Sequence, residues 1–310
     1  MTGSRFVDAG IENIASCVPW FRAEMTKRGI AIPGGSSLAR GMKLTEEFAI
    51  LAQDRPIFKF KGPDGSVRAQ AEYLVVTGID YLTKALHRGV AHGLQITPAQ
   101  LRALTRSNPV LTAPAHVSHK DRNVTWELLL AALATPFTEA ARLVEPPDVK
   151  CTFQDKTVGL SAKVVYTKRT DEFRRDVVKA ARQLEHADVE LGLAALNLVE
   201  VFPHESYMRQ FARTQTREPE AFAEVMNAWV EAFVARQEIP RIAEKLRATQ
   251  MAAAILFVPT ALHFAGQPCP YYRIHYFSRS GDQSRALPFI SALNESSQTV
   301  LAWNPLTVAG

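Results

Sequence analysis

The chain has few cysteines, no long uninterrupted apolar run and no glycine-rich phosphate-binding loop. Its three cysteines, Cys17, Cys151 and Cys269, are far apart and odd in number, which excludes a disulfide framework and a CxxC metal site. The most apolar stretch, residues 251–265, contains a proline and a histidine and is too short to span a bilayer. The N-terminus lacks the basic and apolar regions of a signal peptide. We therefore expect a cytoplasmic protein with no membrane partner.

A GxSxG nucleophile elbow and a dinucleotide-binding fingerprint are also absent, so neither of these enzyme classes is indicated. The 310 residues, of which 47% are hydrophobic and 22% charged, suffice for one large domain or two small ones. The net charge is +5, and residues 1–110 carry 14 Lys and Arg against 9 Asp and Glu. This surplus is compatible with contact to phosphates and equally with a solvated basic face.

The N-terminal region, residues 1–108, is expected to be mainly helical, because its apolar residues recur at helical spacing. Pro19 should kink or split the first helix, whereas Thr97 should cap the last one. The last two helices, joined around residues 89–95, fit either a DNA-reading helix-turn-helix or an ordinary helical pair. The predicted helices cover residues 4–28, 42–53, 74–88 and 97–106.

The rest of the chain, residues 109–310, is expected to form an α/β domain after a proline-containing linker. Apolar periodicity predicts the element order α, β, β, β, α, β in its first half. These six elements cover residues 122–133, 141–144, 148–153, 158–166, 171–186 and 189–198. Helices at 205–215 and 219–248 should follow, and strands at 252–264 and 271–277 should extend the sheet at its far edge.

Short motifs fall on these elements in a definite order. Glu127 lies in the first helix, and Asp148 follows two prolines at the start of the second strand. Lys163 lies on the third strand, and Gln183 on the helix after it. This set resembles the PD-(D/E)XK superfamily, the fold of restriction endonucleases and many repair and defence nucleases. The resemblance covers residues 120–202 and implies a restriction-endonuclease-like αβββαβ core.

Phosphodiester hydrolysis needs an activated water and stabilisation of developing charge, and a divalent cation held by carboxylates supplies both. Side chains alternate along a strand, so Ser161 and Lys163 share one face, and an antiparallel neighbour brings Asp148 to it. Asp148 would be the main metal ligand, with Glu127 as a second acidic group. Lys163 would orient or deprotonate the attacking water, or hold the phosphate. The resemblance adds the Ala162 carbonyl as a ligand and Mg²⁺ or Mn²⁺ as the cofactor.

One position departs from the family pattern. Most active members have Asp or Glu two residues before the lysine, whereas this chain has Ser161, which binds Mg²⁺ far less well than a carboxylate. Glu127 or Glu185 could replace the missing acid. Two functions therefore stay open: a metal-dependent nuclease acting on DNA, or a catalytically decayed module that binds nucleic acid or a partner protein. A homodimer is compatible with either.

Each of these residues also has an ordinary explanation. Asp148 could cap a turn, Lys163 could be an exposed lysine on an edge strand, and Glu127 could face solvent. Burying a lysine between apolar neighbours on a central strand costs free energy unless a carboxylate pairs with its charge. The position of Lys163 in an apolar strand therefore favours a functional site. In that site, Asp148 and Lys163 should lie well within about 10 Å of each other.

Basic residues follow the lysine directly and continue along the next helix. We expect them either to follow the phosphate backbone of DNA or to form an ordinary charged helix face. The residues predicted to contact nucleic acid are Lys168, Arg169, Arg174 and Arg175.

Overall fold

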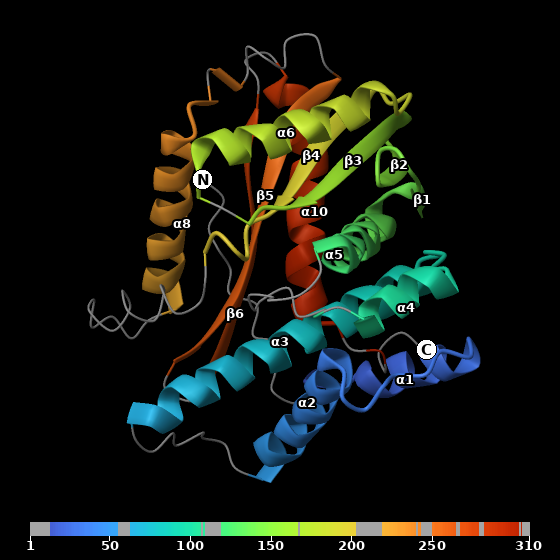
Figure 1. Cartoon of the computed structure of the whole chain (residues 1–310), viewed down its shortest axis with the longest axis vertical. Coiled ribbons are helices and arrows are strands. Elements are labelled where there is room, and N and C mark those ends of the chain that lie inside the picture. Colours follow the sequence, from blue (N-terminus) through green and yellow to red (C-terminus); the bar gives the residue numbers. More distant parts are fainter. Residues whose placement is uncertain are drawn as a thin grey trace.

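The chain forms a mixed α/β fold around one six-stranded sheet, as the computed structural model in Figure 1 shows. Eight α-helices accompany the sheet within the described residues. These are residues 13–54, 63–106, 108, 119–166, 168–202, 219–239, 241–242, 250–264, 267–278, 282–303 and 305. None of the helices in this part of the chain is long and apolar enough to cross a membrane.

The strands lie side by side in the order in which they occur along the chain. They are β1 (Glu139–Leu143), β2 (Val149–Phe153), β3 (Lys156–Val164), β4 (Leu191–Asn197), β5 (Met251–Phe264) and β6 (Gln267–Ser278). β3, β4 and β5 are parallel, whereas β1, β2 and β6 pair antiparallel with their neighbours. As predicted, the last two strands extend the sheet beyond β4.

The β2–β3 hairpin is closed by a two-residue turn. Phe153 pairs with Lys156, and the two residues between them, Gln154 and Asp155, have φ angles of 49° and 60°. Positive φ at both central positions is the geometry of a type I′ turn, whose twist matches that of the strands. The turn thus sets the register of the hairpin without a glycine.

Helices cover both faces of the sheet. α5 (His119–Ala134), α3 (Pro63–Ala91) and α10 (Gln283–Leu301) lie on one face, and α6 (Thr170–Glu185) and α8 (Pro219–Arg236) on the other. Alternate residues of β4 pack into two apolar cores, one on each face of the sheet. Leu193 packs on the α5 side, and Ala194 on the α6 side. Since both faces are covered, β4 is buried along its whole length.

The elements α5, β1, β2, β3, α6 and β4 follow the order that the sequence predicts, with boundaries within three residues of those predicted. The remaining N-terminal helices are α1 (Val18–Lys27), α2 (Ser37–Asp54) and α4 (Pro98–Arg106). The predicted cap of α4 is confirmed: Gln100 N donates to Thr97 Oγ1 at 3.3 Å, and Thr97 N donates to Gln100 Oε1 at 2.8 Å. This reciprocal pair is a capping box.

Three expectations need correction. Pro19 does not kink a helix, because α1 begins at Val18 and the proline occupies its first turn, where no hydrogen bond is lost. The helix predicted at residues 74–88 begins earlier than expected, since α3 begins at Pro63. α10 was not predicted, because it contains Pro288 and several polar residues that are buried and hydrogen-bonded. The predicted helix at 205–215 and the linker at 109–118 lie outside the described residues.

The N-terminal helices share a core with the sheet. Tyr81 of α3 stacks on Tyr272 of β6, with ring centroids 3.8 Å apart and an interplanar angle of 6°. Trp126 of α5 stacks on Phe257 of β5 at 4.8 Å, and all four rings belong to one apolar cluster. The division at residue 108 stays a prediction, and buried contacts connect the two parts.

Candidate functional site

Asp148 and Lys163 form an ion pair on the α6 side of the sheet, with Nζ and Oδ2 3.3 Å apart. Lys163 is the penultimate residue of β3, and Asp148 directly precedes β2 instead of opening it. Because Val149 pairs with Leu160, Asp148 lies opposite Ser161, on the face that Lys163 shares. The predicted proximity is confirmed. The explanation by an edge strand is wrong, since β3 lies between β2 and β4.

The approach of Asp148 depends on a glycine in the neighbouring strand. A Cβ atom on Gly159 would lie 3.1 Å from Pro147 Cγ and 2.9 Å from Val189 Cγ1, so only glycine allows Pro147 to pack against β3. Val144 N donates to the Asp148 carbonyl at 3.1 Å and closes the loop before β2. Asp148 itself has a φ of 155°, which residues other than glycine rarely adopt. The surrounding contacts hold it there.

All the hydrogen bonds that described residues donate to the Asp148 carboxylate go to Oδ2. Ala162 N donates at 2.6 Å, and Ser161 Oγ and Lys163 Nζ both lie at 3.3 Å. Burial raises the pKa of Asp148, although Lys163 and the Ala162 amide act in the opposite direction. Oδ1 accepts no hydrogen bond from the described part of the chain, and it is the oxygen left for a cation.

Gln183 of α6 faces this group, as predicted. Ser161 Oγ and Gln183 Oε1 are 2.6 Å apart. A hydroxyl has one hydrogen, so Ser161 donates either to Gln183 or to Asp148. A half-turn of the Gln183 amide would place its NH₂ at Ser161 and leave the hydroxyl hydrogen for Asp148. In either arrangement, α6 is connected to the carboxylate through Ser161.

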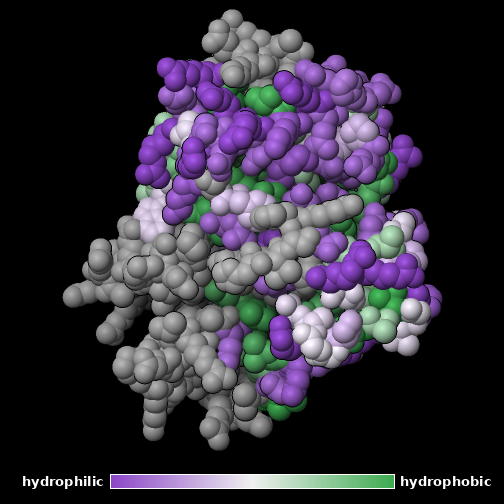
Figure 2. Space-filling view, viewed as in Figure 1, coloured by the Kyte–Doolittle hydropathy of each residue, from purple (hydrophilic) through white to green (hydrophobic). Residues whose placement is uncertain are grey.

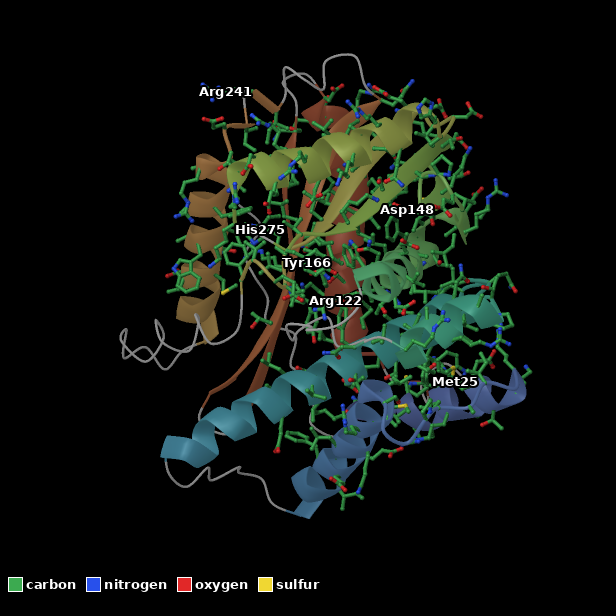
Figure 3. All side chains as sticks on the ribbon, in the orientation of Figure 1. Met25, Arg122, Asp148, Tyr166, Arg241 and His275 are labelled. Atoms are coloured by element: carbon green, nitrogen blue, oxygen red, sulfur yellow. The ribbon has the colours of Figure 1, made fainter. Side chains whose placement is uncertain are left out.

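Glu127 of α5 is coupled to the ion pair by charge. Its pKa is raised from 4.5 to about 7, first by burial and then by the negative charges of Asp148 and Glu145, while Lys163 lowers it. Within the described residues it forms no hydrogen bond with Asp148 or Lys163. In Figure 3, Asp148 lies between α6 and α5. The expectation that Glu127 faces open solvent is therefore wrong.

The sequence argument missed Asp176 of α6. Burial raises its pKa, and the positive charges of Lys179 and Lys163 lower it. Its nearest cation is Lys179, at 3.9 Å. Asp176 precedes Gln183 by seven residues, which places both on one face of the helix. The seven-residue spacing from Gln183 is the sequence signal that identifies Asp176 as a neighbour of the site.

The predicted nucleic-acid-binding residues divide into two kinds. Arg169 and Arg175 form ion pairs of 3.4 to 3.9 Å with Asp171 and Glu172 in the first turn of α6. Lys168, by contrast, is exposed and forms no ion pair with a described residue. Arg174 is half-buried. Hydrophilic side chains gather over α6 in Figure 2, but acidic neighbours balance part of their positive charge.

The donor set suits a hard cation only in part. Asp148 Oδ1 and the Glu127 carboxylate are the oxygen ligands that Mg²⁺ and Mn²⁺ prefer. The Ala162 carbonyl accepts a hydrogen bond from Lys163 Nζ at 2.8 Å, so a cation there would compete with the ammonium group. Among the described residues, no group of three His, Cys, Asp or Glu side chains is arranged to hold a metal. A cation held by these two carboxylates would therefore need water to complete its shell.

Replacing Glu127 with glutamine should stabilise the metal-free protein, and by more as the pH rises. Because the folded-state pKa lies above the unfolded value, the folded state binds more protons between pH 4.5 and 7, and the wild type loses stability as pH rises through that window. Glutamine does not titrate. The gain in Tm, measured by thermal unfolding in chelator, should be small near pH 4.5 and largest above pH 7.

The control for this experiment is Glu139→Gln on β1, because Glu139 is exposed. Its effect on Tm should not change with pH. A Glu127→Gln effect that is equally independent of pH would contradict the electrostatic link between Glu127 and the ion pair.

No protein-family model matches the chain, and no curated protein and no solved structure shows a significant match. The chemistry of the site therefore carries the functional argument.

Proposed function

We propose that the protein is a metal-dependent nuclease that hydrolyses phosphodiester bonds in DNA. The observation that carries this proposal is the buried Asp148–Lys163 pair, whose aspartate keeps one oxygen without a hydrogen bond from the described residues. Glu127 and Gln183 approach the pair from two helices, α5 and α6. An acid, a lysine and a neutral amide around a second acid are the groups that metal-assisted phosphate chemistry uses.

Each side chain has a role in this proposal. Asp148 and Glu127 would hold Mg²⁺ or Mn²⁺, which supplies a polarised water and positive charge for the phosphate. Lys163 has a side chain that is 20% exposed, so its ammonium can reach a phosphate oxygen or orient the attacking water. Ser161, connected to Gln183, positions the Asp148 carboxylate.

The fold gives independent support. α5, β1, β2, β3, α6 and β4 follow the αβββαβ order that the PD-(D/E)XK resemblance implies. Glu127, Lys163 and Gln183 lie on the elements expected for them, and Asp148 directly precedes β2. A fold alone does not establish a function, and the weight of the proposal rests on the site.

A second candidate is a non-catalytic module that binds nucleic acid or a partner protein. The observation that favours it is that Lys163 Nζ contacts both Asp148 Oδ2 and the Ala162 carbonyl, so the carbonyl expected to bind a cation already accepts a hydrogen bond. With Ser161 in place of an acid, the site has one carboxylate fewer than the PD-(D/E)XK pattern. The two candidates predict different responses to metal and to a restored carboxylate.

Cleavage of labelled single-stranded and duplex DNA should require a divalent cation. Mn²⁺ should support it better than Mg²⁺, because a site with few carboxylates tolerates Mn²⁺ more readily. Ser161→Glu should lower the Mg²⁺ concentration required, since it adds a ligand charge beside Asp148. The rate of product formation in each metal and in chelator measures both effects.

Gln154→Glu is the matched control, because it adds the same charge at the exposed hairpin turn and should leave the metal requirement unchanged. If neither the wild type nor Ser161→Glu cuts DNA with either metal, while DNA affinity survives Asp148→Ala, the result supports the binding module over the nuclease.

A further inference from the structure

Lys163 occupies atoms that a cation at this site would need. Its Nζ lies 2.8 Å from the Ala162 carbonyl and 3.3 Å from Asp148 Oδ2. The family resemblance places a divalent cation on the same carbonyl and the same carboxylate, so the two positive charges would meet in one place and repel each other. Lys163 must therefore leave this position before a cation can use both groups.

The Lys163 side chain can move without disturbing the sheet. It is partly exposed, and its ammonium group ends a flexible four-carbon stem. Three acidic side chains interact with its charge: Asp148 before β2, Glu127 of α5 and Asp176 of α6. Asp148 and Glu127 are the proposed ligands of the cation. Of the three acids, Asp176 is the one that takes no part in holding it.

The packing of α6 on β3 brings Asp176 towards Lys163. β3 and β4 are parallel, so α6, which connects them, runs in the opposite direction to β3. Gln183 contacts Ser161, and Asp176 lies two turns nearer the start of α6, about 10.5 Å along its axis. Lys163 lies two residues beyond Ser161, about 6.6 Å in the same direction. The difference of about 4 Å is within reach of a lysine side chain.

Asp176 has the properties that a second partner for the ammonium requires. Its side chain is 25% exposed, compared with 20% for Lys163, so both groups are partly desolvated. It pairs with Lys179 at 3.9 Å, but Lys179 is 68% exposed, and such a surface pair stabilises little. Burial raises the pKa of Asp176, whereas the charges of Lys179 and Lys163 lower it. A closer ammonium would offset the cost of burying this carboxylate.

We propose that Asp176 is a positioning residue that accepts the Lys163 ammonium when a cation binds beside Asp148. The proposal rests on the proposed nuclease function and adds an exchange of partners to it. Lys163 pairs with Asp148 in the metal-free protein and with Asp176 in the metal-bound protein. The exchange keeps the lysine charged and paired, and it leaves the Ala162 carbonyl to the cation. Asp176 acts through Lys163 and touches neither metal nor DNA.

The test measures Mn²⁺ binding to the full chain without DNA, from the electron paramagnetic resonance signal of unbound Mn²⁺. Only binding that Asp148→Asn abolishes is counted, which restricts the measurement to this site. Lys163→Gln should tighten this binding about 10-fold, because no ammonium has to be displaced. Asp176→Asn should weaken it about 3-fold to 30-fold, because the displaced ammonium loses its second partner. Asp176→Glu, which keeps the charge, should retain most of the wild-type affinity.

The double variant separates the exchange from a general effect of charge. In the Lys163→Gln background, Asp176→Asn should change Mn²⁺ affinity less than about 2-fold, because no ammonium needs a second partner. Asp171→Asn is the matched control, because it removes the same charge from the first turn of the same helix. Its effect should stay below about 2-fold in either background. The comparison of Asp176→Asn with Asp176→Glu tests the exchange even if Lys163→Gln does not fold.

Three results would each overturn the proposal. The first is the absence of any Mn²⁺ binding that depends on Asp148. The second is an Asp176→Asn effect of the same size with and without Lys163, which would assign the effect to the charge of Asp176 on the cation itself. The third is an Asp176→Glu effect as large as that of Asp176→Asn.

The fate of the nuclease function is read separately, from DNA cleavage by the wild type. Cleavage in Mn²⁺ by a protein whose Mn²⁺ affinity does not respond to Asp176→Asn would refute the exchange and leave the nuclease intact. Conversely, Mn²⁺ binding in which Asp176 and Lys163 are coupled, in a protein that cuts neither single-stranded nor duplex DNA, would establish the exchange and refute the nuclease.

Discussion

Replacing Asp148 with asparagine should lower the rate of metal-dependent DNA cleavage by on the order of 10³-fold. The change removes the charge that would bind the cation, while the side-chain oxygen can still accept the hydrogen bond from Ala162 N. Burial already disfavours the ionised carboxylate, and Lys163 is partly exposed, so the fold should tolerate the loss of the pair. Cleavage rates in Mn²⁺, measured beside Tm, separate the loss of chemistry from the loss of structure.

Asp155→Asn provides the matched control, because Asp155 lies in the exposed turn of the same hairpin. It makes the same chemical change and should leave the rate near that of the wild type. An Asp148→Asn protein that retains more than about a tenth of the wild-type rate would rule out Asp148 as the main metal ligand.

Replacing Glu200 with glutamine should destabilise the protein by about 3 to 5 kcal/mol. Glu200 pairs at 3.2 Å with Arg122, whose side chain is 0% exposed, and the change removes a charged partner of a buried guanidinium. Arg122 belongs to the first turn of α5, and Tyr166 lies near it in Figure 3, so the loss should also loosen the helix that carries Glu127. Thermal unfolding should show a decrease in Tm of about 5 to 15 °C.

A surface ion pair offers the comparison. Arg241 and Glu238 are 2.8 Å apart but have side chains 69% and 45% exposed, and Glu238→Gln should cost less than about 1 kcal/mol. Combining Glu200→Leu with Arg122→Met should restore part of the stability, because the buried guanidinium is removed together with the carboxylate that pairs with it. A Tm for Glu200→Gln no lower than that for Glu238→Gln would show that the buried pair does not stabilise the fold.

The local spacing of apolar residues and short motifs was sufficient to predict much of the fold and part of the site. Asp148 and Lys163 belong to one hairpin, so strand alternation and the turn between them predict their proximity. Gln183 lies on the next helix, and its side chain was placed through the PD-(D/E)XK resemblance.

The features that sequence reasoning missed depend on contacts between distant segments. Arg122 and Glu200 are 78 residues apart, and no periodicity indicates that they pair. α10 buries polar side chains whose partners lie elsewhere: Ser296 Oγ donates to the Leu133 carbonyl at 2.6 Å. Such residues look exposed in the sequence because their hydrogen-bond partners are supplied only by the tertiary fold.

The turn at Gln154 and Asp155 limits how the chain can vary in evolution. It lies at the opposite end of the hairpin from Asp148, yet it determines which residues of β2 and β3 face one another. A change of register by one residue would turn Asp148 to the other face of the sheet, away from Lys163. Surface turns usually tolerate insertions, and the β2–β3 hairpin would tolerate them only where the pairing of its strands is preserved. The chemistry of the site therefore constrains the length of a loop that never touches it.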